Sequence, residues 1–422
     1  MAEWKVDKEK VFKDPVHDYI YVTDGLIWDL INTRAFQRLR RIRQLGTSFL
    51  TYHGAEHSRF THSLGTYETM RKVLSHFEKN HGWPQDLRTK RLALCAALLH
   101  DIGHGPFSHT IEQVFKTHHE TWTQRILVED PDILAVLTEH VDAEFAQDVA
   151  DVIAKKKHPL VVNLISSQLD VDRMDYLLRD AVHTGVTYGT FELERLIRIM
   201  KPDQDGVVVK KKGMHTVEQY ILARYFMYSQ VYLHPVTIGS DVLLRRIFSR
   251  AKKLHDRGDQ LFMPEELRPF FENRAENVSV KEYLEVDESV VMYTLERWTS
   301  TEDAILRDLA DRFVNRRLFG AVQSKELKEV EREQIREMFR SNGLNPDYYL
   351  EFHKAVAGGY QLYSQGIKLV DDEGRKTDIS QDSGLVRSLQ PETKYRIYCP
   401  KEVLRGEGRY KPIRGWMEAF KI

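Results

Sequence analysis

The sequence contains very little cysteine and no long apolar run. Only two of its 422 residues are cysteine, Cys95 and Cys399. Both lie in apolar or strand-like segments, which indicates reduced packing residues of a cytosolic protein rather than a structural disulfide. No run of about 18 apolar residues occurs, which argues against a membrane-spanning helix. The first ten residues are charged and lack the apolar core of a signal peptide. We therefore expect a cytoplasmic protein without a membrane anchor.

A surplus of charge of either sign is also missing. The formal net charge is -1, although 30% of the residues are charged and 42% are hydrophobic. This balance argues against nucleic acid as a partner, because binding to a phosphate backbone usually leaves a basic surplus on the domain. The length allows one large core and a smaller second domain.

Strand signals are few, and helical periodicity dominates from Leu26 to Arg340. The segment Leu92–Leu99 is apolar on every side, which predicts a helix that is buried all round. The segment Ala304–Leu318 alternates apolar and charged residues near a 3.6 period, which predicts a helix with one wet face. We expect strands at Tyr19–Val22, Val207–Lys211, Ile367–Val370 and Tyr395–Cys399, with a hairpin turn at Asp371–Gly374 between the last two.

A charged stretch, Ser324–Arg340, separates the helical body from a tail of mixed character. Its pattern predicts a solvated helix that carries i,i+4 ion pairs. We place a domain boundary within it. The expected fold is therefore mostly α with a few short β-hairpins in residues 1–330, followed by a smaller α+β domain in residues 331–422, for which oligomerisation is a candidate role.

The segment HDIGHGPFSH follows the buried helix and begins with His100 and Asp101. A histidine and an aspartate at the end of an apolar helix need a partner, because burying an unpaired charge costs several kcal/mol. A core hydrogen bond between them is one solution, and a divalent metal is another. His104 stands four residues after His100 and would share its face if the helix continues. The glycines and proline between them let His109 approach the same place, so a site is favoured over simple packing.

Two further segments carry polar residues at helical spacing. Arg59 and His62 are three residues apart, while Asp172, Tyr176 and Asp180 form one stripe at i, i+4 and i+8. Taken alone, Arg59 and His62 would indicate surface residues. The stripe, taken alone, would indicate an amphipathic helix whose acidic side chains face water. Together with His100 and Asp101, however, they supply two imidazoles and two carboxylates. Such a set suits Fe, Mn, Ni, Zn or Mg with coordination positions left for water and phosphate oxygens.

The order H…HD…D resembles the HD phosphohydrolase superfamily. The segments VFKDPVHDYI, AFQRLRRIRQLG, HSRFTHSLGTY, LLHDIGHGPFSH, VDRMDYLLRDAVHTG and RRLFGAV resemble the deoxynucleoside triphosphate (dNTP) triphosphohydrolases within it. The resemblance covers about Lys10 to Val322, and the tail beyond Arg340 adds little to it. It implies an HD-domain helical core and cleavage of a dNTP to deoxynucleoside and intact triphosphate. It also implies that the metal is held by four residues, His62, His100, Asp101 and Asp172.

The same resemblance implies catalytic roles. His119 would be the general acid for the leaving 5′ oxygen, and Glu112 would fix its proton and tautomer. The family usually has Asp where Glu112 stands, so the carboxylate is kept but its reach changes. His118 is the competing candidate for the acid. His104 and His109 would contact the phosphates.

For the substrate, the resemblance implies a set of arginines and a sugar pocket. The arginines that would neutralise the triphosphate are Arg59, Arg173 and Arg224, although Arg173 also suits an ordinary exposed charge and replaces a lysine of the vertebrate member. The sugar pocket would consist of Gln44, Leu45, Tyr176, Asp180, Tyr228 and Tyr232. Asp180 would accept a hydrogen bond from the 3′-hydroxyl, and the Tyr232 ring would fill the volume of a 2′-hydroxyl. Pro235 stands where the vertebrate member has a phosphate-binding lysine.

Related enzymes assemble as tetramers in which nucleotides between subunits switch activity on. The positions that grip the effector phosphates there correspond to Lys10, Arg40, Lys210, Lys212 and Arg316, each of which would be an ordinary solvated residue if taken alone. Asn32 replaces an aspartate that reads guanine, and Lys13 replaces an asparagine. The resemblance therefore implies a homotetramer with a dNTP or NTP effector whose base differs.

Two alternatives stay open at the level of sequence. One is an HD phosphohydrolase that acts on another nucleotide phosphoester, as a nucleotidase or phosphodiesterase. The other is a nucleic-acid-binding protein with a vestigial metal site, which would use the basic cluster Arg34–Arg43. Only the dNTP reaction yields inorganic tripolyphosphate, so its products distinguish it from both.

Overall fold

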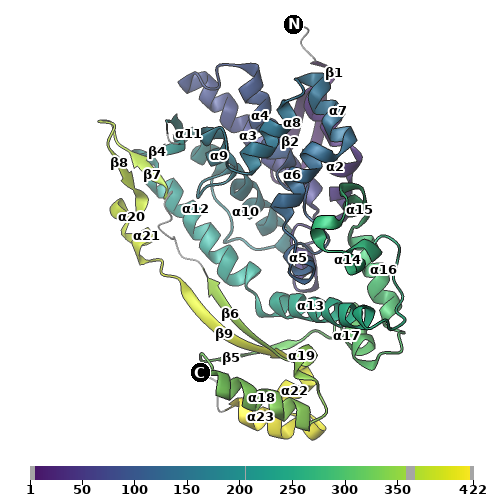
Figure 1. Ribbon diagram of the computed structural model, residues 1–422. Helices are drawn as coiled ribbons and strands as arrows, with labels where there is room; N and C mark the ends of the chain where they lie inside the picture. The colour runs from purple at the N-terminus through teal and green to yellow at the C-terminus, as the bar shows by residue number, and fades with distance from the viewer. Residues whose placement is uncertain (1–4, 205, 358–365, 419–422) are drawn as a thin grey trace.

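The computed structural model describes residues 5–204, 206–357 and 366–418, and it is mostly helical (Figure 1). The α-helices are α1 Gly25–Asn32, α2 Arg34–Arg38, α3 Arg59–His81, α4 Leu87–Leu99, α5 His109–Phe115, α6 His119–Glu129, α7 Pro131–His140, α8 Phe145–Ile153, α9 Pro159–Ile165, α10 Val171–Thr184, α11 Leu193–Ile199, α12 Met214–Phe226, α13 Pro235–Asp256, α14 Arg268–Glu272, α15 Val280–Glu285, α16 Glu288–Trp298, α17 Ala304–Val314, α18 Glu329–Ser341, α19 Pro346–Tyr349, α20 Ile379–Asp382, α21 Gly384–Ser388, α22 Lys401–Arg405 and α23 Lys411–Glu418. Short 3₁₀ helices occupy Leu39–Arg41, Gly46–Leu50, Lys211–Gly213, Ala275–Asn277 and Gly408–Tyr410, and a π-helix, η4, occupies Met227–Tyr232.

The described strands form three small sheets. An antiparallel hairpin joins β1 Lys5–Asp14 to β2 Asp18–Asp24. A four-stranded sheet has the order β3 Met200–Asp203, β4 Gly206–Lys210, β7 Lys368–Val370 and β8 Lys376–Asp378, in which β4 and β7 are parallel. A three-stranded antiparallel sheet has the order β5 Gly320–Ser324, β9 Glu392–Cys399 and β6 Glu351–Ala357. The predicted fold class, mostly α with few and small sheets, is confirmed.

The four predicted strands are present, but one predicted pairing is wrong. Asp371–Gly374 does form a turn, which joins β7 to β8 rather than to β9. The strand β9 pairs instead with β5 and β6, so that Ile397 lies opposite Val322 and Phe352. The strand β8 consists of three polar residues, which carry no apolar alternation that a sequence pattern could detect.

The two predicted helices in the second half of the chain are shorter than expected. The helix α17 ends at Val314 rather than Leu318, and α18 covers only the second part of Ser324–Arg340, since Ser324 belongs to β5. In α18, Arg336 pairs with Glu333 and Glu329 at 3.1 and 2.6 Å. The spacings are three and seven residues, not the predicted four, because an arginine side chain reaches two turns back. The strand β4 pairs with β7, and β5 pairs with β9, so two of the sheets join segments from either side of residue 330. The domain boundary at residue 330 stays a prediction.

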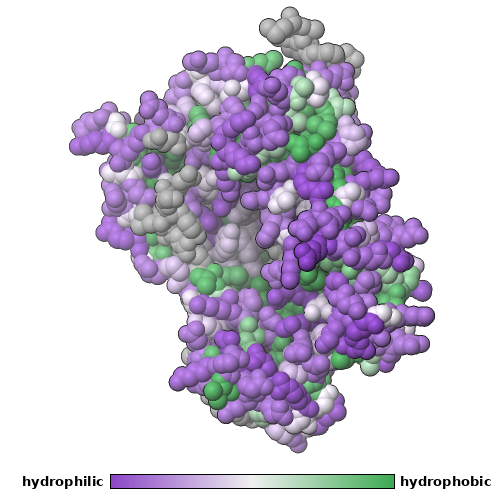
Figure 2. Space-filling view, viewed as in Figure 1, coloured by the Kyte–Doolittle hydropathy of each residue, from purple (hydrophilic) through white to green (hydrophobic). Residues whose placement is uncertain are grey.

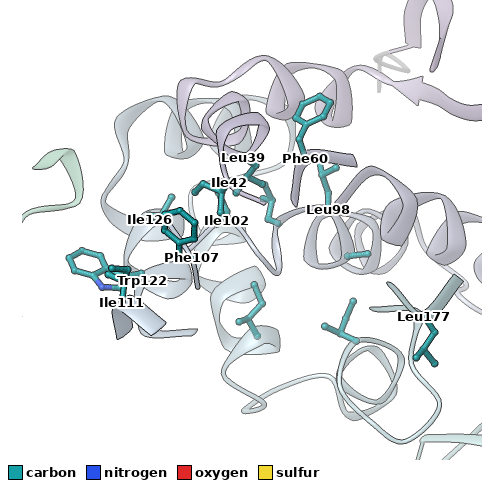
Figure 3. Close-up of a cluster of buried hydrophobic side chains, with 14 of the residues drawn as sticks. Leu39, Ile42, Phe60, Leu98, Ile102, Phe107, Ile111, Trp122, Ile126 and Leu177 are labelled. Atoms are coloured by element: carbon teal, nitrogen blue, oxygen red, sulfur yellow. The ribbon is translucent and has the colours of Figure 1, made fainter. Parts of the chain in front are cut away.

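The helices α3, α4 and α10 form the centre of the helical body. As predicted, α4 is buried on every side, from Arg91 to Leu99. The helices α3 and α10 lie very close together. A Cβ atom added to Gly65 of α3 would lie only 1.9 Å from Asp175 Oδ1 of α10. Figure 3 shows apolar side chains from α3 (Phe60), α4 (Leu98) and α10 (Leu177) in one buried cluster. This core fixes the ends of the three helices relative to one another.

The surface seen in Figure 2 is largely hydrophilic, with small green apolar areas. Among the described residues, we found no helix with both the length and the apolar character needed to cross a membrane. In Figure 1, β5, β6 and β9 lie between α13 and a smaller group of helices that contains α18, α22 and α23.

Candidate active site: a metal group, an acid triad and a polar pocket

Three central helices bring four potential metal ligands together. His62 lies in the first turn of α3, His100 caps the carboxyl end of α4 and Asp101 follows it. Asp172 lies in the first turn of α10, whose amino end is capped by the Asp170 side chain through the Arg173 amide at 2.8 Å. All four groups thus lie at or next to helix ends, and at α10 the Asp170 cap defines the first turn that carries Asp172.

The ligand atoms of His62, His100 and Asp172 lie within 4.8 Å of one another, which suits one cation, and Asp101 lies beside them. His62 Nε2 lies 3.1 Å from Asp172 Oδ1, and His100 Nε2 lies 3.5 Å from carboxyl oxygens of both Asp101 and Asp172. His62 Nε2 is 3.8 Å from Asp101 Oδ2. Ligand atoms bound at about 2.1 Å to one ion lie about 3.0–3.4 Å apart. His100 Nε2 is buried without a hydrogen bond in the described structure, so the donor set fits a divalent metal.

Strong electrostatic coupling accompanies this geometry. Burial would lower the pKa of His62, but hydrogen bonds to Asp172 and Asp175 raise it to about 10. Burial would likewise raise the pKa of Asp172, but His100 and His62 hold it well below its usual range. The Arg59 guanidinium overcomes the effect of burial in the same way and holds the pKa of Asp101 low. The two carboxylates therefore stay ionised and available to a cation.

His104 reaches the metal group by a route that differs from the prediction. The helix α4 ends at Leu99, so His104 does not share a helix face with His100. Two turns follow instead, in which the Ile102 amide donates to Leu99 O and the His104 amide to Asp101 O. Gly103 packs so closely on α6 that a Cβ atom there would lie 2.2 Å from a backbone nitrogen. His104 Nε2 nevertheless lies 3.3 Å from Asp101 Oδ1. The main chain of His109 begins α5, while its side chain is outside the described residues.

A second group, the acid triad, consists of His104, Glu112 and His119. The His119 Nδ1 atom lies 3.1 Å from Glu112 Oε1, and His104 Nδ1 lies 3.8 Å from the same oxygen. The two imidazole rings are stacked at 3.8 Å, with 14° between their planes. The possible ligand atoms lie within 4.8 Å of one another, but a nitrogen lone pair lies in its ring plane. Parallel rings therefore cannot both direct lone pairs at one ion, and the triad suits proton transfer better than metal binding.

The two candidate acids of the sequence are clearly separated. His119 belongs to the acid triad, whereas His118 is exposed at the amino end of α6. Burial and the nearby Arg59 guanidinium lower the pKa of His104 to about 3, so this ring is neutral at neutral pH.

The three candidate phosphate arginines are all bonded to protein oxygens. Arg59 pairs with Asp101 and donates to Ser108 Oγ at 2.8 Å. Arg173 pairs with Asp170, and Arg224 donates to Gln168 Oε1 at 2.6 Å. These contacts orient the guanidinium groups, but they must be partly exchanged if a phosphate is to bind.

The candidate sugar pocket adjoins the metal group. The Tyr176 ring lies 6.3 Å from the His62 ring and 6.2 Å from the Tyr232 ring. Asp180 accepts hydrogen bonds from Tyr232 Oη and from His57 Nε2, both at 2.8 Å. Burial, followed by the Asp180 charge, raises the pKa of Tyr232, which therefore keeps its proton. Asp180 is buried, contrary to the amphipathic-helix alternative.

The remaining pocket candidates lie on neighbouring segments. Gln44 accepts from Arg59 Nη2 through its main-chain oxygen at 3.4 Å, and Leu45 precedes the 3₁₀ helix Gly46–Leu50. Tyr228 lies 5.1 Å from Tyr232, ring to ring, within the π-helix η4. Short π-helical segments often occur at functional sites.

The candidate effector residues are dispersed over the chain. Lys10 lies 5.2 Å above the Trp28 ring, and Asn32 Nδ2 donates to Trp28 O at 2.8 Å, so these two meet around one residue. The others lie on separate elements: Arg40 over the Phe60 ring, Lys210 at the end of β4, Lys212 in the following 3₁₀ helix, and Arg316 bonded to Leu50 O. Pro235 is the first residue of α13.

The sequence reasoning missed His17, Asp175 and His57. Asp175 Oδ2 accepts a hydrogen bond from His62 Nδ1 at 2.8 Å, and Asp175 Oδ1 lies 2.7 Å from His17 Nε2. His17 stands in the motif VFKDPVHDYI, and Asp175 stands in the motif VDRMDYLLRD. The signal that was available is the position of Asp175, one helical turn after Asp172 and so on a nearby part of α10.

Helices that present histidines and aspartates around one cation define a metal-dependent hydrolase of the HD type. The HD domain family matches residues 59–180, and the HD associated region matches residues 191–343. The chain belongs to this family and is an HD-domain phosphohydrolase.

Individual relatives agree with this classification. The chain is 46% identical over 413 residues to the uncharacterized protein YwfO of Bacillus subtilis, covering 95% of this chain and 94% of that protein. It is 27% identical over 275 residues to the Dictyostelium discoideum homologue of the deoxynucleoside triphosphate triphosphohydrolase SAMHD1, covering 61% of this chain and 52% of that protein. The crystal structure of a phosphohydrolase from Bacteroides thetaiotaomicron superposes with a TM-score of 0.83 at 26% identity, covering 93% of this chain and all of that one.

Proposed function

We propose that the protein hydrolyses dNTPs to deoxynucleoside and triphosphate. The observation that carries the proposal is the proximity of the metal group to the residues of the candidate sugar pocket, since the Tyr176 ring lies 6.3 Å from the His62 ring and 6.2 Å from the Tyr232 ring. A nucleotide whose sugar occupied that pocket would have its α-phosphate near the metal group. The similarity to the Dictyostelium discoideum homologue of the deoxynucleoside triphosphate triphosphohydrolase SAMHD1 supports the same assignment.

His62, His100, Asp101 and Asp172 would hold the cation. A divalent metal bound there would lower the pKa of a water molecule and polarise a phosphate oxygen. The ion-pair partner of Asp101 is Arg59, which would turn toward the negative phosphate when the metal neutralises Asp101.

His119 would donate a proton to the leaving 5′ oxygen. Its Nδ1–H would donate to Glu112 Oε1 at 3.1 Å, so the carboxylate would orient the ring and leave Nε2–H as the proton to be transferred. His104, stacked on this ring, would keep it in place and contribute a neutral donor to a phosphate oxygen.

The sugar pocket would favour deoxyribose. Asp180 Oδ1 and Oδ2 each have further lone-pair capacity, so the carboxylate can also accept from a 3′-hydroxyl. The Tyr232 ring, held by its hydroxyl on Asp180, would occupy the space of a 2′-hydroxyl and exclude ribonucleotides sterically.

The proposal includes a cytoplasmic homotetramer activated by a dNTP or NTP at subunit interfaces. It is supported by the pairing of Lys10 and Asn32 around Trp28 and by the exposed positions of Arg40, Lys212 and Arg316. A base in contact with Asn32 would meet an amide instead of a carboxylate, so the effector would differ from guanine nucleotides.

Nucleic acid is not the favoured partner, because the basic cluster Arg34–Arg43 is largely used within the protein. Arg38 is 1% exposed and donates to Val286 O and His104 O. Arg41 pairs with Asp287, and Arg43 with Glu288. The exposed part of the cluster is limited to Arg34, Arg40 and Arg41, of which Arg41 is paired, and this is a small basic surface for a phosphate backbone.

The test is to incubate the purified protein with each dNTP, singly and in pairs, with Mn²⁺ or Mg²⁺, and to separate the products by chromatography. The expected products are deoxynucleoside and tripolyphosphate, and Asp101→Ala should form neither. Release of orthophosphate or pyrophosphate instead would indicate a nucleotidase or another phosphoesterase. Equal rates with single and paired nucleotides would contradict effector activation.

A further inference from the structure

A fully buried charge network lies behind the metal group. It consists of Asp14 at the end of β1, His17 from the turn between β1 and β2, and Asp175 and Arg179 from α10. Their side chains are 4%, 0%, 0% and 0% exposed, respectively. Such a network is costly to bury unless its charges are paired. Here both carboxylates and the guanidinium have identified partners, and His17 is bonded through Nε2, while its Nδ1 is buried without a hydrogen bond in the described structure.

Asp175 is the centre of this network. Its Oδ2 accepts from His62 Nδ1 and from Arg179 Nε, both at 2.8 Å. Its Oδ1 contacts Arg179 Nη2 at 2.9 Å and His17 Nε2 at 2.7 Å. With four contacts the carboxylate cannot rotate, and it fixes the proton of His62 on Nδ1. The Nε2 lone pair of His62 is thereby directed toward Asp172, where the cation would lie.

Asp14 connects the hairpin turn to the same network. Its Oδ1 accepts from the amides of Val16 and His17 at 2.9 and 3.0 Å, which shapes the turn that presents the His17 ring. It also pairs with Arg179, at 2.8 Å through Oδ2 and at 3.2 Å through Oδ1. The turn lies more than 40 residues before the matched HD domain, which begins at residue 59.

Gly65 shows how closely the helices must approach for this arrangement. A Cβ atom at this position would lie 1.9 Å from Asp175 Oδ1 and 2.2 Å from Arg179 Nη2. Only glycine on α3 leaves room for both charged groups, so the helix packing itself is shaped around the network.

We propose that Asp175 and His17 are positioning residues for the metal centre, so that the β1–β2 turn sets the affinity of His62 for its cation. The inference rests on the metal-binding part of the proposed function and not on the substrate. The two carboxylates and the one guanidinium of the network contribute a charge of -1. This charge attracts a cation, while the hydrogen bonds fix the orientation of the His62 ring.

The test measures metal binding without nucleotide. Apo protein is titrated with Co²⁺, and affinity is measured by equilibrium dialysis and by the visible absorption of the bound ion. Asp175→Asn should weaken binding by about 10–100-fold, as is typical when an outer partner of a ligand histidine is lost. His17→Leu should weaken it by about tenfold, whereas His17→Gln, which keeps a donor near Asp175, should stay within about threefold of the wild type.

The matched control is His57→Gln. His57 is also a buried histidine, and its Nε2 donates to Asp180 at 2.8 Å, but it contacts no residue of the metal group in the described structure. The His57→Gln variant should bind Co²⁺ with the affinity and the visible spectrum of the wild type, even if its melting temperature falls. The proposal is overturned if His17→Leu, folded by circular dichroism, binds Co²⁺ like the wild type, or if His57→Gln weakens binding equally. Should Asp175→Asn fail to fold, the His17 pair alone decides. A protein that binds Co²⁺ as expected but releases no tripolyphosphate would contradict the proposed function and leave this inference intact.

Discussion

Replacement of Glu112 by Gln isolates the electrostatic part of acid catalysis. Glu112 Oε1 and His119 Nδ1 are 3.1 Å apart, and at an effective dielectric constant of about 20 two unit charges at that distance interact by about 5 kcal/mol. The His119 side chain is 25% exposed, and Gln keeps a hydrogen bond, so we expect about half of this energy to be lost. That corresponds to a fall in kcat of about 50–100-fold. His119→Asn, which removes the acid itself, should lower kcat by about 10²–10⁴-fold.

The leaving group provides the decisive comparison. With a dNTP the departing 5′ oxygen needs a proton, whereas a p-nitrophenyl phosphodiester releases a stable phenolate. If Glu112 and His119 act as an acid pair, both variants should recover to within about fivefold of the wild type on the nitrophenyl substrate. The matched controls are Glu120→Gln and His118→Asn, two exposed neighbours on or beside the same helix. Equal losses on both substrates, or a Glu112→Gln rate within threefold of the wild type on the natural one, would refute the reasoning.

Three further predictions concern metal, sugar and pH. Removal of metal with EDTA should abolish activity and lower the melting temperature, and Mn²⁺ at about 100 times its Kd should restore about 2.7 kcal/mol of stability; an unchanged melting temperature would contradict a resident cation. Tyr232→Ala should reduce the ratio of kcat/KM for dATP over ATP at least about tenfold, whereas Tyr232→Phe, which keeps the ring, should preserve it. Burial and the neighbouring His57 lower the pKa of His183 from 6.5 to about 4, so the unfolded chain binds the extra proton first and wild-type stability falls as the pH drops from 6.5 to 4. Between pH 6.5 and 4, the free energy of unfolding of His183→Gln should fall by about 1 kcal/mol less than that of the wild type, after allowance for the partial exposure of His183. Urea unfolding at both pH values measures this difference.

Local sequence pattern was sufficient for much of the fold. The all-apolar segment Leu92–Leu99 predicted the buried part of α4, and the helical spacing of Asp172, Tyr176 and Asp180 predicted a helix where α10 lies. Both predictions depend on interactions between residues close in sequence, which a single chain displays directly. Whether the helix continued to His104 was left open, and the close contact of Gly103 with α6, twenty residues later, is a tertiary feature that residue spacing does not display.

Strand pairing, in contrast, could not be predicted from local sequence. The turn Asp371–Gly374 was recognisable, but β8 carries three polar residues, and its neighbour β7 pairs on the other side with β4, about 160 residues earlier. A pairing between distant segments, whether parallel as in β4–β7 or antiparallel as in β5–β9, leaves no local signal in a short strand. For the same reason β9 joined β5 and β6 instead of β7.

What the sequence determined by itself is the chemistry available: two imidazoles and two carboxylates placed at the ends of apolar helices, where burial obliges them to find a counter-charge. Tertiary structure alone decided how those groups face one another. The Asp175 carboxylate, the His17 ring from the β1–β2 turn and the stacked His104 and His119 rings take their places only because α3, α4, α6 and α10 pack at fixed distances. Side-chain type is a property of one residue, but orientation is a property of the close-packed neighbours around it.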